Sequence, residues 1–157
     1  LNCRMNYEEP ISRAKALVGF SREHHYALLL CWKIKMGLAK NIAIDRINAY
    51  LQWFYTTHLL PHFEMEEKWL FPMLPDNNKH KQIALAQHQQ LKALFEQPHK
   101  DTAALTAIQN TLGEHIRFEE RVLFNEIQNA PNFEQTSIGD LHQETKFVDN
   151  ETDAFWK

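Results

Sequence analysis

The sequence predicts an all-α protein, an up-down-up-down antiparallel four-helix bundle with a short N-terminal lead-in and a C-terminal tail. Three observations support this fold class. Only four glycines and six prolines occur in 157 residues, so few positions interrupt the long periodic stretches. Apolar residues in those stretches recur at spacings of three and four, as on the buried face of a helix. The connections between the stretches are short, and short connections join antiparallel neighbours.

Length and composition restrict the classes of protein to which this chain can belong. A chain of 157 residues is expected to form one domain, with the bundle at about 21–128 and the tail at 129–157. The net charge is −3 without a basic patch, which argues against a nucleic-acid partner. The longest apolar run, residues 26–32, is too short to span a membrane, and we find no secretory signal. Two cysteines, Cys3 and Cys31, predict no disulfide framework, so a cytoplasmic location is expected.

The first helix is expected to begin after Ser21 as the N-cap and to end near Lys40. One polar residue, His24, interrupts its apolar stripe, whereas His25 lies on a wetter face. We therefore expect His24 to point inward. The residues of the stripe are Leu17, Phe20, His24, Ala27, Cys31, Ile34 and Leu38.

The second helix is expected from about Asp45 to Leu70, where prolines follow. Pro61 lies inside it and removes one backbone donor, so a bend is expected there. His58 lies one turn before His62, and a core or supporting role is favoured over a role as a fifth imidazole ligand. The inward residues are Leu51, Tyr55, His58, His62, Glu66 and Trp69.

The third helix is expected after the candidate caps Asp76 and Asn77 and is expected to end near Phe95. Its inward residues are Lys81, Ala84, His88, Leu91 and Phe95. The fourth helix is expected from Asp101–Thr102 to about Gln128, with Leu105, Ile108, Leu112, His115, Glu119 and Val122 inside. In the tail, the expected anchors onto the bundle are Phe147, Phe155 and Trp156. The histidines expected on the surface are His80, His99 and His142.

A ten-residue phrase occurs twice, at 62–71 and at 115–124, 53 residues apart. Each copy has a His, a Glu four positions later, a second Glu directly after it, and a final Leu-Phe pair. In a helix, positions i and i+4 share a face with Cβ atoms about 5–6 Å apart. The His and the first Glu of each copy therefore point the same way. The second Glu, Glu67 or Glu120, is turned about 100° further and is expected to reach water.

These patterns predict a site for two metal ions inside the bundle. Each helix contributes one inward histidine, and the second and fourth helices each add a glutamate. The predicted ligands are His24, His62, Glu66, His88, His115 and Glu119. Each ion would take two imidazoles, and both carboxylates would bridge. Two divalent ions and two carboxylates leave a net charge of +2, which oxide, hydroxide or solvent can offset.

Oxygen-rich bridging with imidazole suits iron or manganese better than a closed zinc site. Two iron ions with an oxo or hydroxo bridge are therefore expected, with manganese or zinc as alternatives. The metal-free alternative is a buried network in which each histidine is hydrogen-bonded to a glutamate. Two buried carboxylates would then cost several kcal/mol each if unpaired, so the convergence of six such residues favours metal. No other cofactor and no catalytic residue is indicated.

A set of short motifs identifies the chain as similar to the hemerythrin-like (HHE cation-binding) family, over about 17–128. The motifs are Glu23-His24, His62-x-x-x-Glu66-Glu67 followed by Leu70-Phe71-Pro72, the lone His88, and His115-x-x-x-Glu119-Glu120 followed by Leu123-Phe124. The resemblance implies a non-haem di-iron site. Oxygen carriers of this family have a second histidine four positions along the third helix, where this chain has Lys92. We therefore expect the ion held by the third and fourth helices to be less saturated than in an oxygen carrier. The pattern is instead similar to that of family members that sense iron or repair iron–sulfur centres.

The leading functional hypothesis is a di-iron protein that binds O2, NO or peroxide at open iron positions, in sensing, storage or iron handling. The expected partner is a small diatomic molecule, and the oligomeric state is left open. One alternative is a di-iron oxidoreductase that activates oxygen, reduces NO or repairs iron centres. Another is a structural metal bundle that binds a protein partner.

Overall fold

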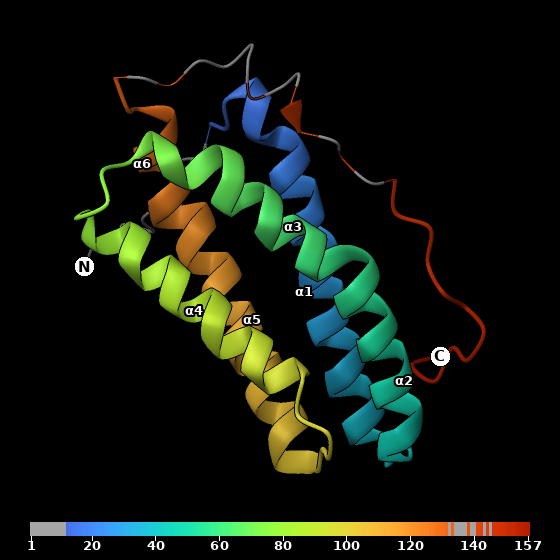
Figure 1. The fold of residues 1–157 in the computed structure, drawn as a ribbon. Coiled ribbons are helices and arrows are strands. Elements are labelled where there is room, and N and C mark those ends of the chain that lie inside the picture. The colour runs from blue at the N-terminus through green and yellow to red at the C-terminus, as the bar shows by residue number, and fades with distance from the viewer. Residues whose placement is uncertain (1–11, 132, 134–137, 139–140, 143, 145) are drawn as a thin grey trace, which may run out of the picture.

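The computed structural model describes residues 12–131, 133, 138, 141–142, 144 and 146–157, and therefore not Cys3. All regular structure in these residues is helical, and the long helices form the predicted four-helix bundle (Figure 1). Among the described residues, no helix combines the length and hydrophobicity needed to cross a membrane.

The bundle consists of four long helical segments, two of which contain changes of helical pitch. The first is the 3-10 turn η1 (Lys15–Leu17) with α1 (Val18–Ala39). The second is α2 (Ile44–Phe54), η2 (Tyr55–Leu59), α3 (Leu60–Met65), η3 (Glu66–Leu70) and η4 (Phe71–Met73). The third is α4 (Lys79–Phe95), and the fourth is α5 (Thr102–Phe118), η5 (Glu119–Leu123) and α6 (Phe124–Gln128). Residues 18–73 are called the first half of the bundle and residues 79–128 the second half.

The helix starts agree with the sequence only in part. The fourth segment begins as predicted, because the side chain of Asp101 accepts a 2.8 Å hydrogen bond from the Ala104 amide. The third begins later than expected, with Asn78 as its cap rather than Asp76 or Asn77. The first begins before Ser21, at Val18. Leu17 and Phe20 are fully buried, so packing extends this helix past the polar residue that was expected to cap it.

The bend expected at Pro61 coincides with a π-helical turn. The turn η2 (Tyr55–Leu59) immediately precedes α3, which has Pro61 in its first turn. Proline donates no backbone hydrogen bond and its ring displaces the carbonyl four residues earlier, which a wider turn accommodates. Figure 1 shows the chain changing direction between α2 and α3.

Both copies of the repeated phrase contain a π-helical turn in the same place. In each copy the turn begins at the first Glu, as η3 and η5. The wider turn holds one more residue, so the positions after it shift by one around the helix axis. Leu70 and Leu123 are therefore fully buried. The expectation that Trp69 and Val122 point inward is wrong by one residue, since both are only half-buried.

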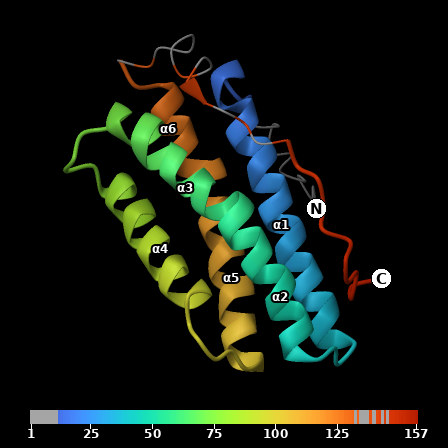
Figure 2. The same ribbon diagram turned by 45° about the vertical axis from the view of Figure 1, so that its right-hand side comes forward.

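The described part of the tail runs beside the bundle, and its C-terminal end lies against α1 and α2 (Figures 1 and 2). Phe155 and Trp156 are 3% and 7% exposed and belong to the same core cluster as α1, α2 and α5, which confirms them as anchors. Phe147 stacks on Tyr26 with ring centroids 4.1 Å apart, so all three predicted tail anchors contact the bundle.

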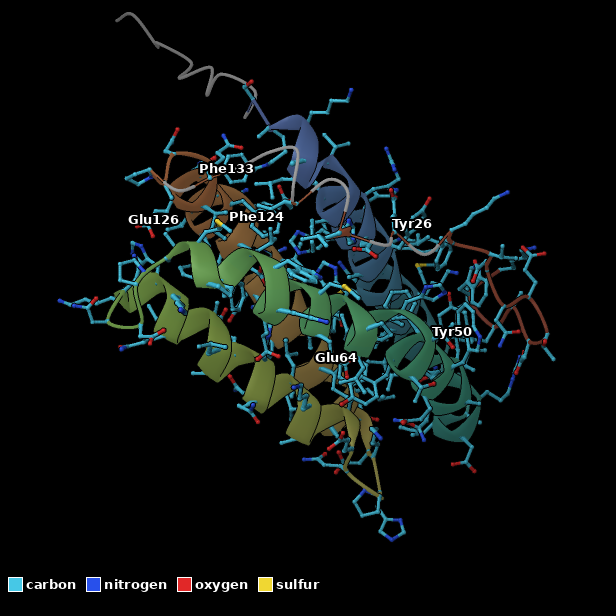
Figure 3. The ribbon with its side chains drawn as sticks, turned by 45° about the horizontal axis from the view of Figure 1, so that its top comes forward. Tyr26, Tyr50, Glu64, Phe124, Glu126 and Phe133 are labelled. Carbon is cyan, nitrogen blue, oxygen red and sulfur yellow. The ribbon has the colours of Figure 1, made fainter. Side chains whose placement is uncertain are left out.

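A buried lysine on α1 also fixes the tail. Lys33 is 2% exposed, and its Nζ lies 2.5 Å from Asp149 and 2.9 Å from the Tyr50 hydroxyl. The same Nζ lies 3.7 Å above the Trp156 ring. Tyr26 and Tyr50 both lie against the tail (Figure 3). Charge pairing and aromatic packing therefore join the tail to α1 and α2.

Candidate metal centre

Six buried side chains meet in the middle of the bundle, and they are the six that the sequence predicts as ligands. Each is at most 3% exposed: His24, His62, Glu66, His88, His115 and Glu119. Their nitrogen and oxygen atoms form two groups, each with all candidate ligand atoms within 4.8 Å of one another. The first-half group is His24, His62 and Glu66, and the second-half group is Glu66, His88, His115 and Glu119. Glu66 belongs to both.

The Nε2 atoms and the carboxylate oxygens of these residues converge without bonding to one another. His62 Nε2 lies 3.0 Å from Glu66 Oε1, and His24 Nε2 lies 3.5 Å from Glu66 Oε2. His88 Nε2 lies 3.4 Å from Glu66 Oε1 and 3.5 Å from Glu119 Oε1. Among the described residues, none of these atoms has a hydrogen-bond partner. Between the six residues, the inward atoms therefore do not form the His–Glu hydrogen bonds of the metal-free alternative.

The outward ring nitrogens of two imidazoles contact carboxylates from neighbouring helices. His62 Nδ1 lies 3.0 Å from Glu23 Oε1, and His24 Nδ1 lies 2.7 Å from Glu120 Oε1. A carboxylate only accepts, so each Nδ1–H donates. The side chain of Glu120 is 25% exposed and so reaches water as expected, but it also contacts His24 of α1.

The second half repeats this arrangement with two changes. His115 Nδ1 donates to the side-chain oxygen of Gln87 at 2.7 Å, so an amide stands where the first half has Glu23. His88 Nδ1 lies 3.6 Å from Glu67 Oε1, at ion-pair rather than hydrogen-bond distance. Glu67, like Glu120, is part-exposed as expected and also faces a histidine. Its other oxygen lies 3.8 Å from Lys92 Nζ.

The four partners form a ring around the bundle. Each histidine is paired with a residue from the preceding helix, with the fourth helix serving the first. For His24, His62 and His115, the hydrogen bond at Nδ1 holds the ring orientation and directs Nε2 inward. Sequence reasoning missed these partners, although Glu23 and Gln87 each directly precede a predicted ligand. The cluster thus has both the donors and the outer supports that a cation site needs.

Charge also favours a cation at this place. Burial alone lowers the pKa of His62, but Glu66 and Glu23 outweigh burial and raise it to about 10. The pKa of His88 is likewise lowered by burial and raised more strongly by Glu119, Glu66 and Glu67, to about 11. Burial raises the pKa of Glu66, yet the neighbouring histidines, His62 first, hold it well below its usual range. The carboxylates therefore attract positive charge into the cluster, as protons or as a metal cation.

Comparison with known proteins agrees with this geometry. The family profile described as the hemerythrin HHE cation binding domain matches residues 17–127. The chain belongs to this family. No curated protein and no solved structure matches the chain. The buried cluster is accordingly the candidate cation site of a hemerythrin-like protein.

The two ligand groups of the hemerythrin-like site differ in size. Glu119 joins only the second-half group, which therefore has four candidate donors against three in the first half. The expectation that Lys92 leaves the second half less saturated than in an oxygen carrier stays a prediction. Lys92 lies instead near Glu67, in the outer ring of partners.

The structure also shows where the other described histidines of this hemerythrin-like chain lie. His25 is exposed, whereas its neighbour His24 lies in the cluster, as the apolar stripe predicts. His58 belongs to neither metal group and lines a small cavity beside His62. His142 was expected on the surface, but its side chain is 5% exposed and its Nε2 lies 2.9 Å from Glu23 Oε1. His80 is part-exposed and pairs with Glu126 at 2.6 Å, and His99 is exposed.

Proposed function

We propose that this chain is a di-iron hemerythrin-like protein that binds O2, NO or peroxide, in sensing, storage or iron handling. The observation that carries the proposal is the set of buried imidazole nitrogens and carboxylate oxygens that converge without hydrogen-bond partners. A buried polar atom without a partner is costly, and a coordinated cation removes that cost at all of these atoms together. The six ligand residues named from the sequence are the proposed metal ligands.

Iron is the proposed metal because the donors are imidazoles and carboxylates without thiolates, and because one carboxylate, Glu66, reaches both groups. Iron bound there would supply coordination positions that accept a small oxygen- or nitrogen-containing ligand. The protein supplies the other requirements. It fixes the imidazoles through the outer ring of partners and keeps the site dry, since all six proposed ligands are buried.

A small ligand fits the space beside the site better than an organic substrate does. A cavity of about 10 Å³ lies against His62 and Glu23, with the apolar side chains of Phe54 and Leu59 and the ring of His58 among its walls. That volume admits about one water-sized molecule. The first-half group, with three candidate donors, lies next to it. We therefore favour ligand binding over the oxidoreductase alternative, and we propose that the bundle and its tail form one domain.

The test is metal analysis followed by spectroscopy. Protein purified from iron-supplied cells is expected to contain two iron ions per chain. After anaerobic reduction, exposure to NO or to air is expected to change the optical spectrum. Protein that carries no iron, or ferrous protein whose spectrum is unchanged by both gases, would contradict the proposal.

A further inference from the structure

The C-terminal tail lies outside the family match, which ends at residue 127, yet one of its residues reaches the metal centre. His142 is 5% exposed at its side chain and stacks on Phe20 with ring centroids 3.7 Å apart. Its Nε2 lies 2.9 Å from Glu23 Oε1. A ring nitrogen near a carboxylate oxygen donates to it, so His142 holds the Glu23 side chain in place.

The same oxygen of Glu23 also accepts the hydrogen bond from the proposed ligand His62, at 3.0 Å. Glu23 Oε1 therefore links a tail histidine to a ligand histidine. The second half of the bundle differs at this point. There, Gln87 is the partner of His115, and no hydrogen bond from a described tail residue reaches Gln87.

The tail also forms a wall of the cavity beside His62. Phe147 lines that cavity together with Tyr26 and His58. The ring of Phe147 lies 4.1 Å from the ring of Tyr26 and 5.0 Å from that of His58, centroid to centroid. The tail thus contacts the first-half site at two places, once through a hydrogen bond and once through apolar packing.

We propose that His142 is a positioning residue for the first-half metal ion, acting through Glu23 on His62. The inference rests on the proposed metal-binding function. Loss of an outer partner of a metal-bound histidine typically weakens metal affinity by about 10–100-fold. Loss of His142 frees Glu23 rather than removing it, so the lower end of that range applies. The effect is expected at one ion of the two, because the described tail residues hydrogen-bond to the outer partner in the first half and not to Gln87 in the second.

The test compares ferrous iron binding by the full chain and three variants under anaerobic conditions. His142→Ala is expected to lower the affinity for one of the two ions by about tenfold and to leave the affinity for the other unchanged. His142→Gln keeps an N–H donor and is expected to restore most of that affinity. Asp153→Ala removes the tail's exposed ion pair with Arg46 and serves as the matched control, with unchanged binding. Equal weakening of both ions, or no weakening in His142→Ala, would overturn the proposal.

A second measurement needs no metal and separates this inference from the proposed function. In the metal-free protein, His142→Ala is expected to shift the imidazole NMR signals of His62 and to leave those of His115 unchanged, since their outer partners differ. Unchanged His62 signals would overturn the inference even if the protein binds two ions. If the wild-type protein binds no iron but His142→Ala still shifts the His62 signals, the proposed function is rejected and the linkage through Glu23 stands.

Discussion

Glu66 and Glu119 occupy the same position in the two copies of the repeated phrase but have different surroundings. Glu66 belongs to both ligand groups, whereas Glu119 belongs to the second-half group only. Glu66→Ala is therefore expected to remove or weaken both metal ions, and Glu119→Ala is expected to leave one ion bound. Elemental analysis of purified variants gives the number of ions per chain. Glu64→Ala is the matched control, because Glu64 is exposed on the same helix. Loss of both ions from Glu119→Ala would show that both carboxylates bridge.

Protons compete with metal at the same nitrogens. Without metal, the pKa values of His62 and His88 are about 10 and about 11, so both imidazoles carry protons at neutral pH. Metal binding needs neutral imidazoles and must release those protons. Metal affinity is therefore expected to rise with pH between pH 6 and 8, by up to about tenfold per pH unit for each proton released. Competition against a chelator of known affinity at several pH values measures the slope. A pH-independent affinity would contradict this assignment of charge.

Single residues show what the sequence can and cannot predict about the site. The choice of His24 over His25 followed from the period of the apolar stripe, because burial on a helix repeats every three to four residues. The outer partners could not be found in this way. His142 and Glu23 are 119 residues apart, and Gln87 and His115 are 28 apart, so their pairing depends on how the helices pack.

At the scale of the helices, the sequence predicted their existence, order and approximate length. The hydrophobic period indicates where the chain is helical, and the turn residues indicate where each helix ends. It did not predict the π-helical turns. Such a turn depends on the balance between backbone hydrogen bonds and side-chain packing, which local propensity does not report. One added residue per turn was enough to place Leu70 inside instead of Trp69 and to bring the part-exposed Glu67 near His88.

Helix caps give a prediction at the same scale. Asp101 accepts the Ala104 amide at the start of α5, and Asp101→Ala is expected to lower the free energy of unfolding by about 1 kcal/mol. Metal content should stay unchanged, because the cap is remote from the cluster. Urea denaturation of the wild type and the variant measures the difference. Thr102→Ala, at the next residue, is the control and should cost only a few tenths of a kcal/mol, about what is typical for a surface change. Equal losses in both variants would argue against a capping role.

At the scale of the whole molecule, one buried charge contributes to the attachment of the tail. Lys33→Ala leaves Asp149 without its cation and removes the amine from the Trp156 ring. Breaking a fully buried ion pair costs about 3–5 kcal/mol, and the partial exposure of Asp149 reduces the expected loss to about 2 kcal/mol. Urea denaturation monitored by tryptophan fluorescence measures it. Lys35→Ala on the exposed face of α1 is the control, and an equal loss there would contradict the prediction.

The packing of the tail on the bundle also predicts how fast small molecules reach the centre. Phe147 forms part of the wall of the cavity beside His62, so Phe147→Ala should widen the path to that side. The reaction of the ferrous protein with NO is expected to become faster, with the final spectrum unchanged. Stopped-flow absorbance measures the rate. Leu141→Ala, which changes an exposed apolar residue of the same tail, should leave the rate unaltered. An unchanged rate in Phe147→Ala would place the path elsewhere.

The ring of partners around the four histidines gives this single chain the symmetry of a two-fold dimer of helical hairpins. Each half contributes two imidazoles, a π-helical turn and a glutamate that supports a histidine of the other half. In a two-fold dimer, identical subunits must make identical contacts. A single chain has no such restriction, and in its described residues the tail hydrogen-bonds to Glu23 but not to the counterpart Gln87. Joining the hairpins in one polypeptide therefore allows two groups of similar candidate ligands to have different neighbours.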